Sequence, residues 1–173
     1  MKLIKQNTTQ RNTQPRYIIE VTFMHGDADH YDHESITVPE NQIETAYPFI
    51  LATKCCLAAY PHGRGGYDNY NGLPEYDAFF GGDIPDPKHY QFLNPNNNLS
   101  EHELEERITE HLKELNQHEF YMEHPSDSNY GIQSSFDDIK ITYIDEQDNE
   151  SEVKIELSEA EQNHIKKCKN FFQ

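Results

Sequence analysis

The spacing of the apolar residues is the feature that most restricts the fold of this chain, because the period of that spacing changes from segment to segment. In residues 16–24 every second side chain is apolar, which gives an extended segment one buried face. A second alternating segment ends at Pro39, so a β-hairpin closed by residues 26–33 is predicted. The apolar residues of these segments are Tyr17, Ile19, Val21 and Phe23, then Ile36 and Val38.

Helical spacing replaces this alternation in three later segments. Residues 42–60 are apolar at helical intervals, and Pro48 marks either a kink or the start of that helix. Residues 100–117 and the segment that starts at Ser158 each begin with the Ser-x-x-Glu pattern of a capping box. A second hairpin is predicted over residues 136–157. Its facing apolar residues are Ile139, Ile141 and Tyr143 on one strand and Val153, Ile155 and Leu157 on the other, with the turn at Asp148 and Asn149.

Two hairpins separated by helices predict an α+β fold, a small antiparallel sheet with helices packed on one face. A length of 173 residues suits one domain, residues 16–173, preceded by a polar arm over residues 1–15 that we expect to be mobile. Residues 60–98 hold six of the eight glycines and five of the nine prolines, so a long loop is predicted there. The same loop carries eight Tyr or Phe residues, and packing of its rings over the sheet is the plainest interpretation.

The charge of the chain restricts its partners. A net charge of −17 repels nucleic-acid phosphate and anionic membrane, and it favours a basic protein or bound cations. Acidic residues are concentrated in the predicted helix 100–117 and in residues 145–152. They indicate either a solvated face or a row that imitates phosphates and blocks a nucleic-acid-binding protein. The candidate partner-binding residues of the helix are Glu101, Glu105, Glu106, Glu110 and Glu114.

The Gly-rich part of the long loop offers a second candidate contact surface. Arg64 is flanked by Tyr67 and Tyr70, a grouping that is typical of protein-contact hot spots. A Gly-rich turn that serves only the fold explains the same residues equally well. The segment lacks the Gly-Lys-Ser/Thr of a phosphate-binding loop.

The first hairpin loop contains the densest group of candidate metal ligands. Imidazole and carboxylate together suit a divalent transition metal better than calcium or magnesium. A solvated turn and an acid–base site remain the alternatives, and His25 also extends the apolar face of the first strand. No cofactor follows from the sequence with certainty. The candidate ligands are His25, Asp27, Asp29, His30, Asp32 and His33.

Two His-x-Ser triplets, which begin at His33 and His124, resemble the paired pattern of the 2H phosphoesterase family. In that family two imidazoles exchange general acid and general base roles across one phosphate. The resemblance implies a phosphoesterase, and the hairpin cluster implies a metal-dependent hydrolase. These are the enzymatic alternatives to a binding function.

In composition and in stretches such as "PHGRGGYDNYNGLPEYD" the chain resembles small acidic accessory proteins of tailed bacteriophages. That resemblance implies a non-enzymatic protein that binds and neutralises a basic host protein, including one that binds nucleic acid. Direct nucleic-acid or membrane binding is not expected, and a homo-oligomer stays open. With no secretory signal and an odd number of cysteines, we expect the cytoplasm, that of the host if the chain is viral.

Overall fold

A computed structural model describes most of the chain, namely residues 14–25, 30–59, 70–81, 85–127 and 132–170. Its strands are β1 (Arg16–Met24), β2 (Tyr31–Pro39), β3 (Ser126–Asp127), β4 (Ile132–Gln133), β5 (Ser135–Ile144) and β6 (Glu150–Val153). Its helices are η1 (Glu40–Ala46), α1 (Tyr47–Ala59), α2 (Pro74–Phe79), η3 (Pro87–Leu93), α3 (Glu101–Leu115) and α4 (Glu159–Lys169), where η marks a 3-10 helix.

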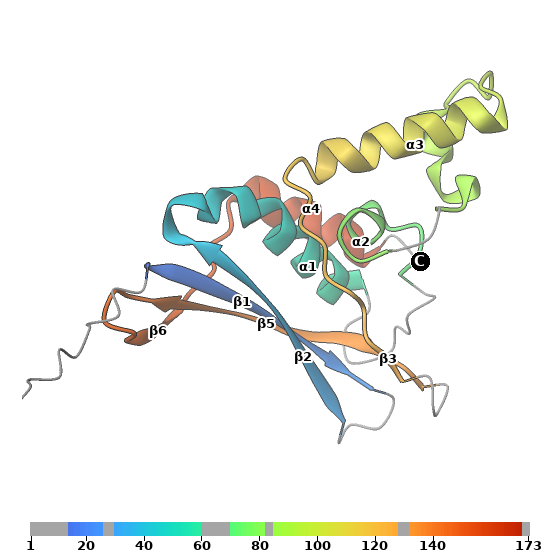
Figure 1. Ribbon diagram of the computed structural model, residues 1–173. Coiled ribbons are helices and arrows are strands. Elements are labelled where there is room, and N and C mark those ends of the chain that lie inside the picture. The colour runs from blue at the N-terminus through green and yellow to red at the C-terminus, as the bar shows by residue number, and fades with distance from the viewer. Residues whose placement is uncertain (1–13, 26–29, 60–69, 82–84, 128–131, 171–173) are drawn as a thin grey trace, which may run out of the picture.

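The main sheet has the order β2-β1-β5-β6, and all of its neighbouring strands are antiparallel. Figure 1 shows the sheet below and α1, α2 and α4 on one of its faces. The predicted α+β fold, with two hairpins and helices packed on one face, is therefore confirmed. A short ribbon of β3 and β4 is added, which the sequence pattern did not predict.

The core lies between the sheet and α1. Ile19, Val21 and Phe23 of β1 are fully buried, as their alternation predicted. Phe136 of β5 packs its ring against Phe23 at a centroid distance of 4.9 Å. The aromatic cluster around these two rings is completed by Tyr70, Tyr76, Phe80 and His124.

The described parts of residues 60–98 contain short helices rather than an extended loop. A proline begins each one, Pro74 in α2 and Pro87 in η3, where its missing N–H costs no hydrogen bond. The rings of Tyr70, Tyr76 and Tyr90 are buried, so the described part of this segment packs most of its aromatic side chains inward, whereas Phe92 is exposed. In the described residues 70–81 and 85–98 the regular elements are short, as their Gly and Pro content favours.

Two boundaries differ from the sequence-based expectations. Pro48 is the second residue of α1, which means that it starts the α-helix after η1 and does not kink it. Strand β6 ends at Val153, so the expected pairing of Ile155 and Leu157 in the second hairpin is wrong. These two side chains instead line an apolar hollow of about 440 Å³ beside α1.

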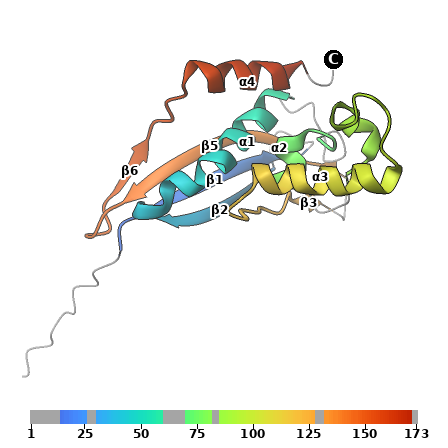
Figure 2. The same cartoon turned by 90° about the horizontal axis from the view of Figure 1, so that it is seen from above.

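Helix α3 stands apart from the sheet and packs on α2 and η3. Figures 1 and 2 show it on the outer side of the helical layer, well separated from α4. Its contact with η3 is a small apolar cluster of Tyr90, Leu104 and Ile108, and its last residue, Leu115, packs against the main core. Both capping boxes are confirmed, at Ser100 for α3 and at Ser158 for α4. Among the described helices, none is long and apolar enough to cross a membrane.

Replacing Phe136 with alanine should lower the free energy of unfolding by about 3–5 kcal/mol, because the ring is buried and its removal leaves a cavity. Phe92→Ala is the matched control, since 53% of Phe92 is exposed and its loss should cost less than about 1 kcal/mol. Urea unfolding followed by circular dichroism measures both values. Equal losses in the two variants would contradict this placement of the core.

Candidate functional site

The predicted hairpin metal site is only partly assembled by the described residues. His25 is buried at the end of β1, and its Nε2–H donates to Asp32 Oδ2 at 2.6 Å. The other ring nitrogen, Nδ1, is also buried and has no hydrogen-bond partner among the described residues. Asp27 and Asp29 lie outside the described residues, and His30 is exposed. A metal site in this hairpin remains a prediction.

His33 does not join this pair. It follows Asp32 directly on β2, and successive side chains of a strand point to opposite faces. Its Nδ1 lies 3.0 Å from Thr22 Oγ1 and 3.8 Å from Glu20 Oε1. Both partners belong to the face of β1 that carries no helix, so His33 and Asp32 point away from each other.

The second histidine of the 2H phosphoesterase pattern is a core residue. His124 Nε2–H donates to the carbonyl oxygen of Ser134 at 3.1 Å, and Nδ1 accepts from the Tyr76 hydroxyl at 2.9 Å. Burial lowers the pKa of His124 to about 4, with a smaller contribution from the nearby charge of His25. A neutral imidazole with both nitrogens occupied is not placed to exchange protons with a bound phosphate.

The predicted partner-binding residues fall into three groups. Tyr70 is fully buried in the aromatic cluster, so its assignment to a contact surface is wrong. Its hydroxyl accepts the backbone N–H of Phe136 at 3.2 Å, which explains why the ring turns inward. Arg64 and Tyr67 lie outside the described residues. Helix α3 exposes most of its acidic side chains, namely Glu101, Glu106, Glu110 and Glu114, while Glu105 is half-buried.

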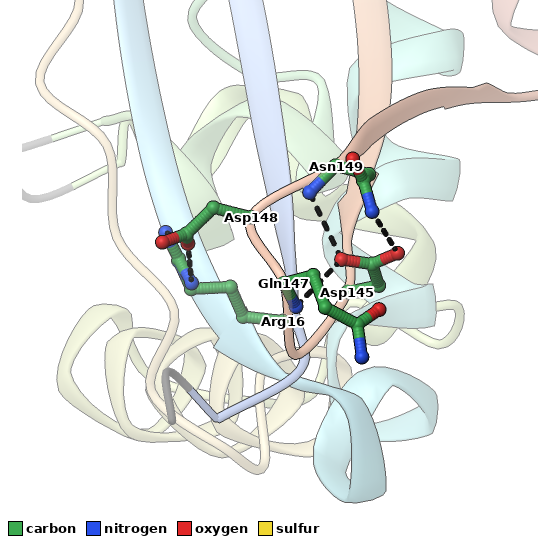
Figure 3. Close-up of polar contacts among 5 residues, drawn as sticks. All are labelled: Arg16, Asp145, Gln147, Asp148 and Asn149. Atoms are coloured by element: carbon green, nitrogen blue, oxygen red, sulfur yellow. Dashed lines mark hydrogen bonds and ion pairs between the residues drawn. The ribbon is translucent and has the colours of Figure 1, made fainter. Parts of the chain in front are cut away.

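The acidic residues 145–152 do not extend the acidic face of α3, because the two views place the β5–β6 turn and α3 at opposite ends of the molecule. Figure 3 shows how this turn uses its own carboxylates. Asp145 accepts from the Asn149 side chain and backbone and from the Gln147 backbone, and these hydrogen bonds lower its pKa. Asp148, at φ 62°, pairs with Arg16 at 3.4 Å.

A different group of side chains forms the best-defined candidate site. The Cys/Glu/His cluster consists of Cys55 on α1, Glu75 on α2, and His164 and Cys168 on α4. One ligand atom from each residue lies within 4.8 Å of all the others. Among the described residues, this is the one group of three or more His, Cys, Asp and Glu side chains placed to hold a metal ion.

Burial differs across the cluster. Both cysteines are buried, only 10% of the Glu75 side chain is exposed, and 46% of the His164 side chain is exposed. His164 Nε2 lies 2.5 Å from Glu75 Oε1, so the histidine closes the cluster from the solvent side. The Cys55 pKa is raised, by its hydrogen bond with Cys168 and by burial, which keeps the thiol protonated.

Sequence reasoning missed this cluster because three separate helices contribute to it. His164 and Cys168 are four residues apart in the last predicted helix, a spacing that places both side chains on one face. That spacing was the available signal. Cys55 and Cys56 lie in the apolar segment 42–60 and both are buried, but nothing in that segment points to Cys168.

No protein-family model, curated protein or solved structure matches this chain. The chemistry of its sites therefore rests on the residues and their geometry.

Stability should fall as the pH is lowered from about 6.5 to about 4, because the unfolded chain protonates His124 in this range while the folded chain does not. At pH 4 this linkage amounts to about 3 kcal/mol. His124→Gln removes the titration. We expect the His124→Gln variant to be less stable than the unmodified chain at pH 7. The difference between their unfolding free energies should therefore shrink by about 3 kcal/mol between pH 7 and pH 4.

Comparing the two proteins at each pH is necessary because other groups titrate in the same range. Burial raises the pKa of Asp77 to about 6, which has the opposite effect on stability as pH falls. Asp77 is present in both proteins, so its contribution cancels in the difference. Urea unfolding at pH 7, 6, 5 and 4 gives the values. A difference that stays constant with pH would show that His124 titrates normally.

Proposed function

We propose that this chain is a non-enzymatic binding protein that engages a basic partner through the acidic side of α3. The partner is a Lys- and Arg-rich protein surface, of the kind that nucleic-acid-binding proteins carry, and complex formation blocks that surface. The resemblance to small acidic phage accessory proteins implies the same role, with a host protein as the target. The single observation that carries the proposal is the exposed row of carboxylates on a helix at the outer side of the helical layer.

The row has a regular spacing. Glu106, Glu110 and Glu114 recur every fourth residue, so their side chains lie along one side of α3 at intervals of about 6 Å. All three are exposed, and the buried residues of the helix, Leu104 and Ile108, lie on the other side. A partner can therefore approach the row without displacing the core.

Helix stability does not explain this arrangement. Like charges four residues apart destabilise a helix by roughly 0.2–0.5 kcal/mol per pair. The helix carries six glutamates against one arginine and one lysine. Its stability comes from its capping box and its apolar contacts, whereas the glutamate row opposes it. A basic partner would relieve that repulsion, which favours a role in binding.

Exposed aromatic side chains lie beside α3 and supply apolar contact area. The ring of Phe92 on η3 meets His111 of α3 at a centroid distance of 5.7 Å. Tyr121, which is exposed, lines an open hollow of about 310 Å³ together with Leu112 and Lys113. Aromatic anchors beside charged residues are the usual composition of protein–protein contact surfaces.

Neutralising the row should weaken binding to a Lys/Arg-rich helical peptide about tenfold, since three exposed ion pairs of roughly 0.5 kcal/mol each sum to about 1.5 kcal/mol. Fluorescence anisotropy with the labelled peptide gives the dissociation constant at low and at moderate salt. Higher salt should weaken the unmodified complex, because exposed charges are screened within about 10 Å at 0.1 M. The variant carries Glu106→Gln, Glu110→Gln and Glu114→Gln.

The control variant removes the same number of charges from the opposite end of the molecule, by the exposed β5–β6 substitutions Glu146→Gln, Glu150→Gln and Glu152→Gln. It should change the dissociation constant less than about threefold. Equal weakening in both variants would assign the binding to net charge alone and remove α3 from the proposal. Salt-independent binding would exclude an electrostatic contact altogether.

A further inference from the structure

The Cys/Glu/His cluster takes no part in the proposed binding surface, since α3 contributes none of its residues. We propose that this cluster binds one divalent transition-metal ion, zinc by the chemistry of its donors, and that the ion fastens α4 to α1 and α2. The site is distinct from the hairpin in which the sequence predicted a metal. Its role is structural, because all four donors come from the protein.

The donor set selects the class of metal. Two cysteine sulfurs and one histidine nitrogen are soft or borderline ligands that favour zinc, whereas magnesium and calcium prefer oxygen donors. One carboxylate completes a four-coordinate set of the kind that zinc accepts in proteins. Because each thiol releases its proton to solvent as its sulfur binds, zinc with two thiolates, one carboxylate and a neutral imidazole carries a net charge of −1.

The distances suit an ion after a small adjustment. Zinc–ligand lengths of about 2.0–2.3 Å place tetrahedral donor atoms roughly 3.3–3.8 Å apart. The four donor atoms lie within 4.8 Å of one another before any ion is placed among them. His164 and Glu75, at 2.5 Å, would move apart, and His164 is free to do so because its side chain is half-exposed.

The burial of Glu75 is the second observation that points to a cation. A carboxylate that is nine-tenths buried is costly unless a positive charge or hydrogen bonds compensate it. Its partner is His164, which stands at the solvent boundary. The sulfur atoms of Cys55 and Cys168, both on buried residues, lie within 4.8 Å of the same carboxylate. A divalent ion at the centre would compensate Glu75 and join all four side chains.

Helix α4 is the element that gains most from such an ion. Cys168 is its one buried residue in the described segment, and Ile165 is only partly buried against the core. Figure 2 shows α4 running along the outer side of α1. One buried and one partly buried side chain remove little apolar surface from water, so they hold a helix weakly. Two of the four donors, His164 and Cys168, come from α4, so metal binding would fix its position directly.

The test uses the full chain, purified without a metal-binding tag and stripped of metal by chelator, with Zn²⁺ and Co²⁺ as probes. We expect one zinc per chain by elemental analysis and a rise in Tm on adding Zn²⁺. Co²⁺ should give the intense visible bands of tetrahedral coordination and a thiolate-to-cobalt charge-transfer band. Absence of stoichiometric zinc, or cobalt spectra without the thiolate band, would overturn the proposal.

Neighbouring cysteines provide a matched pair of variants. Cys55 and Cys56 are both fully buried on α1, but only Cys55 belongs to the cluster. Cys55→Ala should abolish the cobalt thiolate band and the Tm rise, whereas Cys56→Ala should keep both. If Cys55→Ala fails to fold, the surface substitution His164→Ala decides the matter, with an expected loss of zinc affinity of at least tenfold. Unchanged affinity in His164→Ala would overturn the four-ligand site.

Two further outcomes identify competing explanations. If His25→Ala removes zinc binding while Cys55→Ala keeps it, the ion belongs to the predicted hairpin site and not to the cluster. If the unreduced chain has the mass of a protein with one intramolecular disulfide between Cys55 and Cys168, an oxidant has joined the two thiols. In that case zinc binding only after reduction would support the proposal, and no binding after reduction would overturn it.

Discussion

The fold depends on β1, which is hydrogen-bonded along both edges, to β2 on one side and to β5 on the other. A strand paired on both sides has its backbone polar groups satisfied, and its side chains must alternate between the two faces. Ile19, Val21 and Phe23 therefore form an apolar floor. Helix α1 packs over this sheet, and α2 and α4 pack on α1. These successive contacts set the positions of the residues in the Cys/Glu/His cluster.

The acidic helix is attached differently, and this separates the two proposed sites. Helix α3 rests on η3 through its own small apolar cluster, and it also packs on α2. No residue of the Cys/Glu/His cluster lies on α3. Asn116, at the end of α3, donates its side-chain amide to the carbonyl oxygens of Ala78 and Phe120, which fixes how the helix leaves the core. Helix α3 is therefore anchored on one side and charged on its exposed side, an arrangement that suits the proposed binding of a basic partner.

Local patterns in the sequence were sufficient for the two hairpins and the longer helices, but not for the short elements α2, η3, β3 and β4 or for the sites. The alternation in β1 and the two capping boxes involve residues close together in the chain, so both could be predicted. Tyr70 was misassigned because an exposed contact loop and a loop packed inward have the same composition of Gly and Tyr. His33 and Asp32 were grouped together because β2 begins earlier than expected, which makes them alternate across a strand. The Cys/Glu/His cluster requires three helices to meet, and no local pattern encodes that.

The central position of β1 also governs the order in which the chain can fold. Met24 of β1 and Ser135 of β5 pair although they are 111 residues apart in the chain. The hairpin of β1 and β2 can close early, since its partners are near neighbours. Until β5 is synthesised and the long connection closes, the inner edge of β1 has no partner strand, and joining the two ends of that connection costs entropy. Folding should therefore be limited by this late pairing, and the waiting hairpin is the stage at which the chain is most exposed to aggregation.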